Sequence, residues 1–212
     1  MVDWGTLANV GTAAGTALLA VATFSSTRSA NVAARNAERG LLHGLRPILV
    51  PTRWEDPVQK VRFIDGQWVA VRGGRGVLEA SDEAVYLVTS LRNVGRGLAV
   101  LHGWDLVFEY NAEHRRPEEF HRLTRDIYIA PGDNGFCQVA LRDPGAEQFV
   151  TLTERAKDKE PFSIDVLYGD AEGGQRVITR IGLSASPAQD SKETEWAISA
   201  GRHWNLDRPD PR

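Results

Sequence analysis

The sequence predicts a mainly β protein, an antiparallel immunoglobulin-like β-sandwich preceded by one long N-terminal α-helix. Two observations predict this fold. Apolar residues and alanines follow a helical pattern up to Pro47, and apolar residues alternate with polar ones after it. The strand-like runs then follow one another with few helical segments between them, which is typical of antiparallel sheets. The expected organisation is a transmembrane helix over 1–27, a juxtamembrane helix over 28–46, the β-sandwich over 47–206 and a tail over 207–212.

The N-terminal segment from Trp4 to Thr27 contains no charged residue and is long enough to cross a bilayer core. Its alanines favour helix, and Gly11 and Gly15 form a small-xxx-small pair that lets two helices approach closely. Glycines, threonines and Asn9 dilute its apolar content. A membrane span is the preferred interpretation over a buried helix of a soluble protein. It is also preferred over a cleaved signal peptide, because such a peptide begins with a positive region and this chain begins MVDWG.

Basic residues follow the predicted span and set its orientation. Arg28, Arg35, Arg39 and Arg46 lie downstream with one acid, Glu38, among them. The positive-inside rule therefore places the N-terminus outside and the β-domain at the cytoplasmic face of the cell membrane. In one continuous helix the four arginines share a face, so they are candidates for contact with anionic lipid headgroups. An alanine seam for oligomerisation and a solvated face, with the apolar stripe packed on the β-domain, are the alternatives.

Several elements of the β-domain are predicted from local patterns. Asp65-Gly66 between two apolar runs indicates a hairpin. Alternation places Trp104 and Leu106 on one strand face, and His102 shares their parity. Two strands are expected around the turn PGDNG, and a hairpin over 162–183. Helices are expected at 116–123, where Pro117 suits a helix N-terminus, and at 147–160.

Composition and motifs argue against several classes of function. The net charge is −3 and the pI is about 6.0, unlike a dedicated nucleic-acid binder. Cys137 is the one cysteine, so neither a disulfide nor a thiolate zinc cluster forms within the chain, and it is expected to be a small buried residue. No phosphate-binding loop, G-x-S-x-G or H-E-x-x-H motif is present. The sequence therefore predicts no enzyme, cofactor, metal site or small-molecule ligand.

Two polar groups are weighed as sites. The acids Asp105, Glu109, Asp165 and Asp170 are of the type that serves glycosidic acid-base chemistry, but nothing in the sequence fixes their separation. Arg202, His203 and Trp204 form the most unusual polar-aromatic cluster and are predicted as a partner surface, because tryptophan and arginine are favoured at interfaces. The alternative is a last strand whose Trp196 and Trp204 close one end of the sandwich.

The stretches RSANVAARNAERGLLHGLRP, LRNVGRGLAVLHGW, LYGDAEGGQRVITR and RHWNLDRPDPR carry a resemblance that covers nearly the whole chain. With them the chain resembles uncharacterised bacterial single-pass membrane proteins with a C-terminal β-sandwich domain. The resemblance implies fold and topology, and it transfers no functional residues.

The function expected from the sequence is a non-catalytic binding, scaffold or accessory role at the cytoplasmic face of the membrane. The expected partners are membrane lipid and, through the N-terminal helix, another membrane protein or a second copy of the chain. One alternative is a membrane-tethered hydrolase with a histidine-carboxylate site. The other is a soluble β-domain with a packed N-terminal helix.

Overall fold

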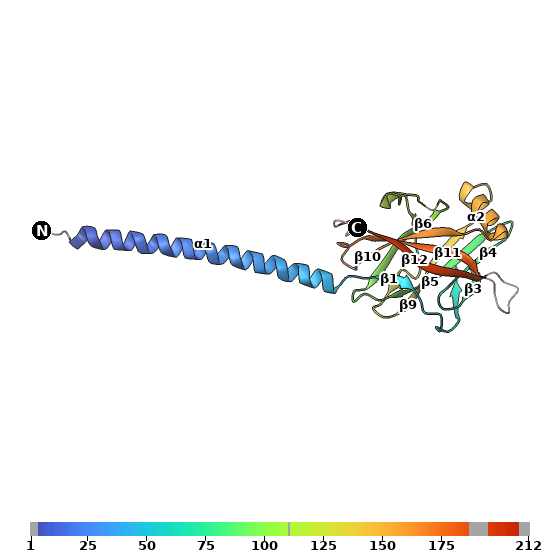
Figure 1. The fold of residues 1–212 in the computed structure, drawn as a ribbon, viewed down its shortest axis with the longest axis horizontal. Helices are drawn as coiled ribbons and strands as arrows, with labels where there is room; N and C mark the ends of the chain where they lie inside the picture. Colours follow the sequence, from blue (N-terminus) through green and yellow to red (C-terminus); the bar gives the residue numbers. More distant parts are fainter. Residues whose placement is uncertain (1–3, 110, 187–194, 208–212) are drawn as a thin grey trace. The chain divides into compact units, whose positions relative to one another are not determined.

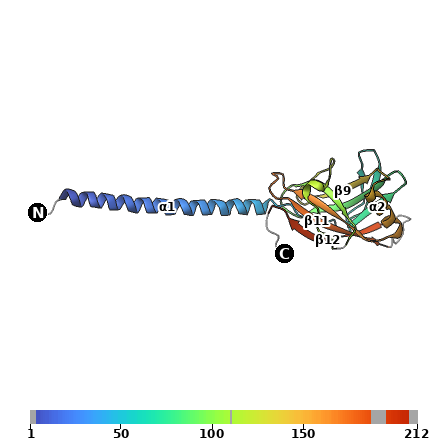
Figure 2. The same cartoon turned by 90° about the horizontal axis from the view of Figure 1, so that it is seen from above.

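The computed structural model describes residues 4–109, 111–186 and 195–207, with the side chains of 4–11, 13, 14, 17, 42 and 43 outside the description. The chain divides into two compact units, Met1–Gly44 and Leu45–Arg212. Helix α1 (Trp4–Gly44) runs without a break in both views of the fold (Figures 1 and 2). At 1.5 Å per residue it is on the order of 60 Å long. It ends before Arg46, because Gly44 and Pro47 disfavour a further turn.

The second unit is built from antiparallel strands and one further helix, α2 (Figure 1). In chain order the elements are β1 (Leu49–Pro51), β2 (Gln59–Arg62), β3 (Trp68–Val71), β4 (Arg75–Ala80), β5 (Val85–Asn93), β6 (Ala99–Val107), the 3-10 turn η1 (Pro117–Glu119), β7 (His121–Arg122), β8 (Tyr128–Ile129), β9 (Asn134–Leu141), α2 (Glu147–Asp158), β10 (Phe162–Gly169), β11 (Val177–Ser186) and β12 (Glu195–Asn205).

The mainly β, antiparallel prediction is confirmed, but most of the strands belong to one large sheet and not to two sheets of similar size. Ten of them form one sheet in the order β1-β5-β4-β12-β11-β10-β6-β7, with β9 paired to β5 and β8 paired to β6. Strands β2 and β3 form a separate hairpin. Strands β6 and β9, at opposite ends of the sheet order, also approach each other, so the sheet curls around its own core.

The main core lies on the inner face of this curled sheet. Alternate residues of β10 supply Phe162, Ile164, Val166 and Tyr168 to it, as the sequence predicts. Facing strands contribute Leu87, Leu91, Leu101, Val139, Ile181, Leu183 and Trp196, and α2 adds Phe149 and Leu152. Among the described side chains, all residues of the three core clusters come from the second unit, so the β-domain contains its own hydrophobic core.

The outer face of the sheet is also partly covered. The β2–β3 hairpin buries Val61, Phe63, Val69 and Val71 against Val77 of β4 and Val88 of β5. The connection after β6 places Phe120 against Leu167, Ile178 and Trp204. Several strands are therefore buried on both faces, and polar residues on their outer side need partners within the protein.

Some local predictions are confirmed and others are wrong. The Asp65-Gly66 hairpin forms, with Gly66 at φ 92°, and α2 falls within the predicted 147–160. The helix predicted at 116–123 is only the turn η1, because Phe120 enters the outer cluster and β7 pairs with β6. The strands flanking PGDNG do not pair with each other: β8 pairs with β6 and β9 with β5.

Asn93 joins three segments at one end of the sheet. Its side chain is fully buried, and its Oδ1 accepts hydrogen bonds from the backbone N–H groups of Ile48 and Gly95. Its Nδ2 donates to the carbonyl oxygens of Gly97 and Ile129 at 2.7 and 3.0 Å. The amide therefore satisfies four backbone groups that surround it.

Replacing Asn93 by leucine is expected to lower the free energy of unfolding by about 3 kcal/mol, because buried backbone groups lose their partners. Asn93→Asp keeps both accepting bonds but turns an oxygen toward the carbonyls of Gly97 and Ile129, so it too is expected to be less stable than the native protein. Urea unfolding of the three proteins measures these losses. A loss below about 1 kcal/mol for the leucine variant would contradict the role of the amide.

Candidate functional site

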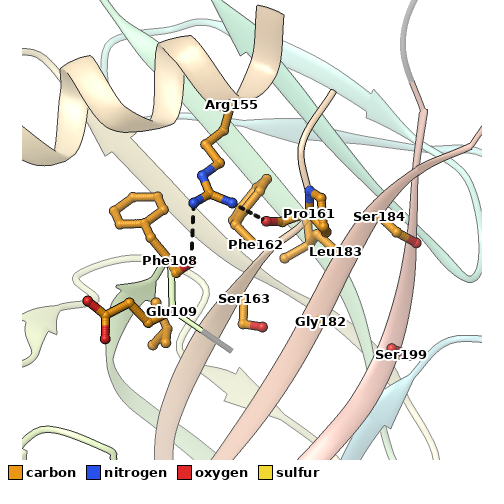
Figure 3. Close-up of a pocket in the computed structure, with 11 residues that line it drawn as sticks. Phe108, Glu109, Arg155, Pro161, Phe162, Ser163, Gly182, Leu183, Ser184 and Ser199 are labelled. Carbon is orange, nitrogen blue, oxygen red and sulfur yellow. Dashed lines mark hydrogen bonds between the residues drawn. The ribbon is translucent and has the colours of Figure 1, made fainter. Parts of the chain in front are cut away.

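A pocket of about 340 Å³ lies on the outer face of β10, β11 and β12, beside the end of β6 and the C-terminal part of α2 (Figure 3). Its size is at the lower end of the range for small-molecule sites. The residues that line it come from four strands, from α2, from the chain just after β6 and from the chain just before β10. The pocket is therefore a product of the tertiary fold.

Its floor is one row of the sheet. Val107, Ser163, Gly182 and Ser199 are successive partners across β6, β10, β11 and β12. A Cβ atom on Gly182 would lie 3.3 Å from the Oγ of Ser199 and 3.9 Å from that of Ser163. The glycine therefore leaves a hollow between two serine hydroxyls, neither of which has a hydrogen-bond partner in the part of the chain that the structure describes.

Arg155 of α2 fixes the walls of the pocket. Its Nη1 donates to the carbonyl of Pro161 at 2.7 Å and its Nη2 to that of Phe108 at 3.3 Å, as the dashed lines show (Figure 3). Glu109 places a carboxylate at the solvent-exposed rim. The pocket is thus lined by two phenylalanine rings and by serine hydroxyls and one carboxylate, and the last two kinds of group are suited to hydrogen bonding.

A buried ion pair lies two residues further along the same strand faces. Asp165 of β10 is fully buried, and its two carboxylate oxygens accept from Nε and Nη2 of Arg180 of β11 at 2.7 and 2.8 Å. The remaining Nη1 of Arg180 donates to the carbonyl of Ala112. The guanidinium also lies 5.0 Å from the ring of Trp204. The pair is fully hydrogen-bonded, as a buried pair must be.

Asp105 lies directly opposite Asp165 across the β6–β10 pairing. It is 2% exposed and forms an ion pair with Arg115 at 3.2 Å. Burial raises the pKa of Asp105 above its ordinary value, the guanidinium of Arg115 opposes that rise, and the charge of Asp165 adds to it. Asp105 and Asp165, whose separation the sequence does not fix, are therefore neighbours. Each of them forms an ion pair with an arginine.

The predicted parity of His102 is wrong. The β6–β10 pairing shifts by one residue between Leu167 and Tyr168, so His102 is the extra residue of a bulge. Leu101 and Trp104 both enter the core instead. Burial, then the charge of Arg176, lower the pKa of His102, and its Nε2 has no hydrogen-bond partner among the described residues.

Two of the other histidines pack against tryptophan rings. His114 contacts the edge of the Trp204 ring, and His121 stacks on Trp104 with ring centroids 4.3 Å apart. Within the described residues, neither they nor His102 hydrogen-bonds a carboxylate. The same residues contain no cluster of His, Cys, Asp and Glu able to hold a metal ion.

The predicted partner surface consists of Arg202, His203 and Trp204 on β12, and the three side chains have different surroundings. Trp204 is 7% exposed and lies between the guanidinium groups of Arg180 and Arg202, each 5.0 Å from its ring. His203 contacts Nη2 of Arg46 through its Nε2, and its Nδ1 lies 2.9 Å from the hydroxyl of Thr179. Arg202 is the member of the group that is exposed.

The four arginines predicted to contact lipid headgroups do not all lie on α1. Arg28, Arg35 and Arg39 are exposed on α1, but Arg46 lies beyond the helix and bonds to Asn205 and His203 of β12. Arg46 is therefore part of the β-domain, and the expectation of four arginines on one helix is wrong for it. Both glycines of the predicted helix-packing pair lie in α1. A Cβ atom on Gly15 would meet no neighbour within 4 Å, and the surroundings of Gly11 are not among those that the structure describes.

In the described part of the chain, no helix is both long and apolar enough to cross a membrane. The side chains of Trp4, Leu7, Val10 and Gly11, which belong to the predicted span, lie outside that description. Cys137 is buried, as expected, and burial raises the pKa of its thiol to about 12.

Comparisons with protein-family models, curated proteins and solved structures found no match. The resemblance to bacterial single-pass proteins and the immunoglobulin-like relationship therefore stay predictions. Sequence reasoning also missed the pocket, because Ser163, Gly182 and Ser199 belong to no motif and only strand register brings them together.

Asp105→Asn is expected to gain stability relative to the native protein as the pH rises from 3 to 7. The raised pKa means that the folded chain holds this proton more tightly than the unfolded chain, so native stability from this group is present at low pH and lost as pH rises. Urea midpoints at both pH values measure the trend.

Arg115→Gln provides the matched comparison, since it removes the cation that faces the ionised carboxylate. It is expected to cost stability at pH 7 and little at pH 3. If the difference between Asp105→Asn and the native protein is the same at both pH values, burial of the Asp105 charge is not the controlling factor.

Proposed function

We propose that this protein is a membrane-anchored, non-catalytic binding protein, with α1 as the anchor and the β-domain as the binding module. The observation that carries the proposal is the exposure of α1. Leu18, Leu19, Val21 and Phe24 are each between 68% and 72% exposed. At 100° per residue they point in different directions around the helix, so no single protein face covers all of them.

The absence of charge supports insertion of this part of α1 into a bilayer. No charged residue lies between Asp3 and Arg28. Thr16, Thr23 and Thr27 donate their hydroxyl protons to backbone carbonyls one turn earlier, which satisfies these side chains without water. The exposed Arg28, Arg35 and Arg39 then favour an N-terminus outside and a β-domain in the cytoplasm.

The chemistry of the β-domain supports binding over catalysis. The pocket over Gly182 offers hydroxyls and a carboxylate, and none of the residues that line it is a histidine, cysteine or lysine. An activated nucleophile needs an adjacent base or a lowered pKa, and Glu109, the one carboxylate of the lining, forms no hydrogen bond with these serines among the described residues.

Leu19→Arg is expected to weaken membrane attachment, because it places a charge among the exposed apolar side chains. Val32→Arg is the matched control: it adds the same charge to an exposed position of the same helix, after Arg28. Full-length protein is tested by carbonate extraction of membranes and by flotation with vesicles. Resistance to carbonate is expected for the native chain and for Val32→Arg, with a substantial loss for Leu19→Arg.

A native full-length chain that stays in the aqueous fraction would reject the anchor and favour a soluble protein. Equal retention of both variants would also contradict insertion at Leu19.

The orientation is tested with Glu172→Cys, at an exposed turn between β10 and β11. Cys137 is buried and does not compete for thiol reagents in the folded protein. A membrane-impermeant maleimide is expected to label the introduced thiol in lysed cells and not in intact cells. Labelling in intact cells would place the β-domain outside.

A further inference from the structure

The β2–β3 hairpin has a buried face and an exposed face of contrasting composition. Val61, Phe63, Val69 and Val71 point into the domain. The exposed positions that alternate with them are Lys60, Arg62, Ile64, Trp68, Ala70 and Arg72, and we call this set the hairpin face. It combines three cations with two large apolar side chains.

The two large apolar side chains of the hairpin face are exposed to solvent. Ile64, beside the turn, is 73% exposed and Trp68 is 55% exposed. Arg62 and Trp68 are cross-strand partners, and the guanidinium carbon lies 5.8 Å from the centre of the Trp68 ring. A cation and an aromatic ring are therefore presented together to solvent.

The positive charge of the hairpin face is largely uncompensated. Lys60 and Arg62 form no ion pair in the described part of the chain, and Arg72 reaches Glu195 at 3.3 Å while 63% exposed. The nearby acid Asp65 is already engaged, because its Oδ2 accepts from Tyr86 at 2.6 Å and from Nη2 of Arg142 at 2.8 Å. The hairpin face is therefore suited to a negatively charged partner.

We infer that the hairpin face binds the anionic surface of a lipid bilayer, with Lys60 and Arg62 on phosphate or carboxylate headgroups and Ile64 and Trp68 at the interface. Tryptophan and an apolar tip beside cations suit the headgroup layer, where each nearby cation adds attraction. Lysine is depleted at protein interfaces, so Lys60 favours lipid over an acidic protein. The inference rests on the proposed anchoring, which brings the domain to the bilayer.

The test uses the full-length chain in vesicles, with an environment-sensitive fluorophore on Ala70→Cys in the hairpin face. The native thiol of Cys137 is buried, so the label is specific. The same label on Glu172→Cys is the position control. Vesicles of neutral phosphatidylcholine are compared with vesicles that contain phosphatidylserine, and flotation of each sample reports anchoring separately.

A blue shift at position 70 in phosphatidylserine vesicles alone, with none at position 172, supports the inference. Lys60→Glu with Arg62→Glu is expected to abolish the shift, whereas Arg96→Glu with Lys157→Glu, at exposed cations outside the hairpin face, is expected to leave it. No shift in protein that floats, or an equal shift in neutral vesicles, overturns the inference and leaves an acidic protein as the partner of this face. Loss of flotation itself refutes the anchor and not the hairpin face.

Discussion

The buried ion pair between Asp165 and Arg180 is the interaction on which the outer face of the β-domain depends. It lies on β10 and β11, in the middle of the sheet order, and both partners are nearly inaccessible to water. Such a pair is tolerated only when every charged atom is bonded. The third bond of Arg180, to Ala112, draws the segment after β6 over the sheet, and Trp204 lies against the same guanidinium.

This arrangement explains where the pocket is and why it has its chemistry. Next to the ion pair the same face of the sheet carries the small residues Ser163, Gly182 and Ser199, and the pocket lies over them. Arg155 stabilises the far wall through two backbone carbonyls. The charges of Asp165, Arg180 and Arg155 are thus bonded within the protein, whereas serine hydroxyls and the carboxylate of Glu109 line the pocket.

Local features of this fold were predictable from the sequence, and long-range ones were not. Asp65-Gly66, the alternation of β10 and the helix over 147–160 depend on neighbours in the chain, and the structure has them. The bulge at His102 and the pairing of Asp165 with Arg180 depend on strand register. The short β7 depends on its pairing with β6, and the contact of Arg46 with Asn205 depends on where the fold brings β12. The pocket belongs to this second group, since no motif marks its residues.

The helix and the β-domain present two different surfaces to a membrane in this account. The exposed apolar residues of α1 are distributed around its axis, whereas the hairpin face combines three cations with the exposed Ile64 and Trp68. Insertion of α1 can be measured by oriented circular dichroism of the full-length protein in stacked bilayers. The expected spectrum is that of a helix steeply inclined to the bilayer plane. A helix lying parallel to that plane would contradict insertion.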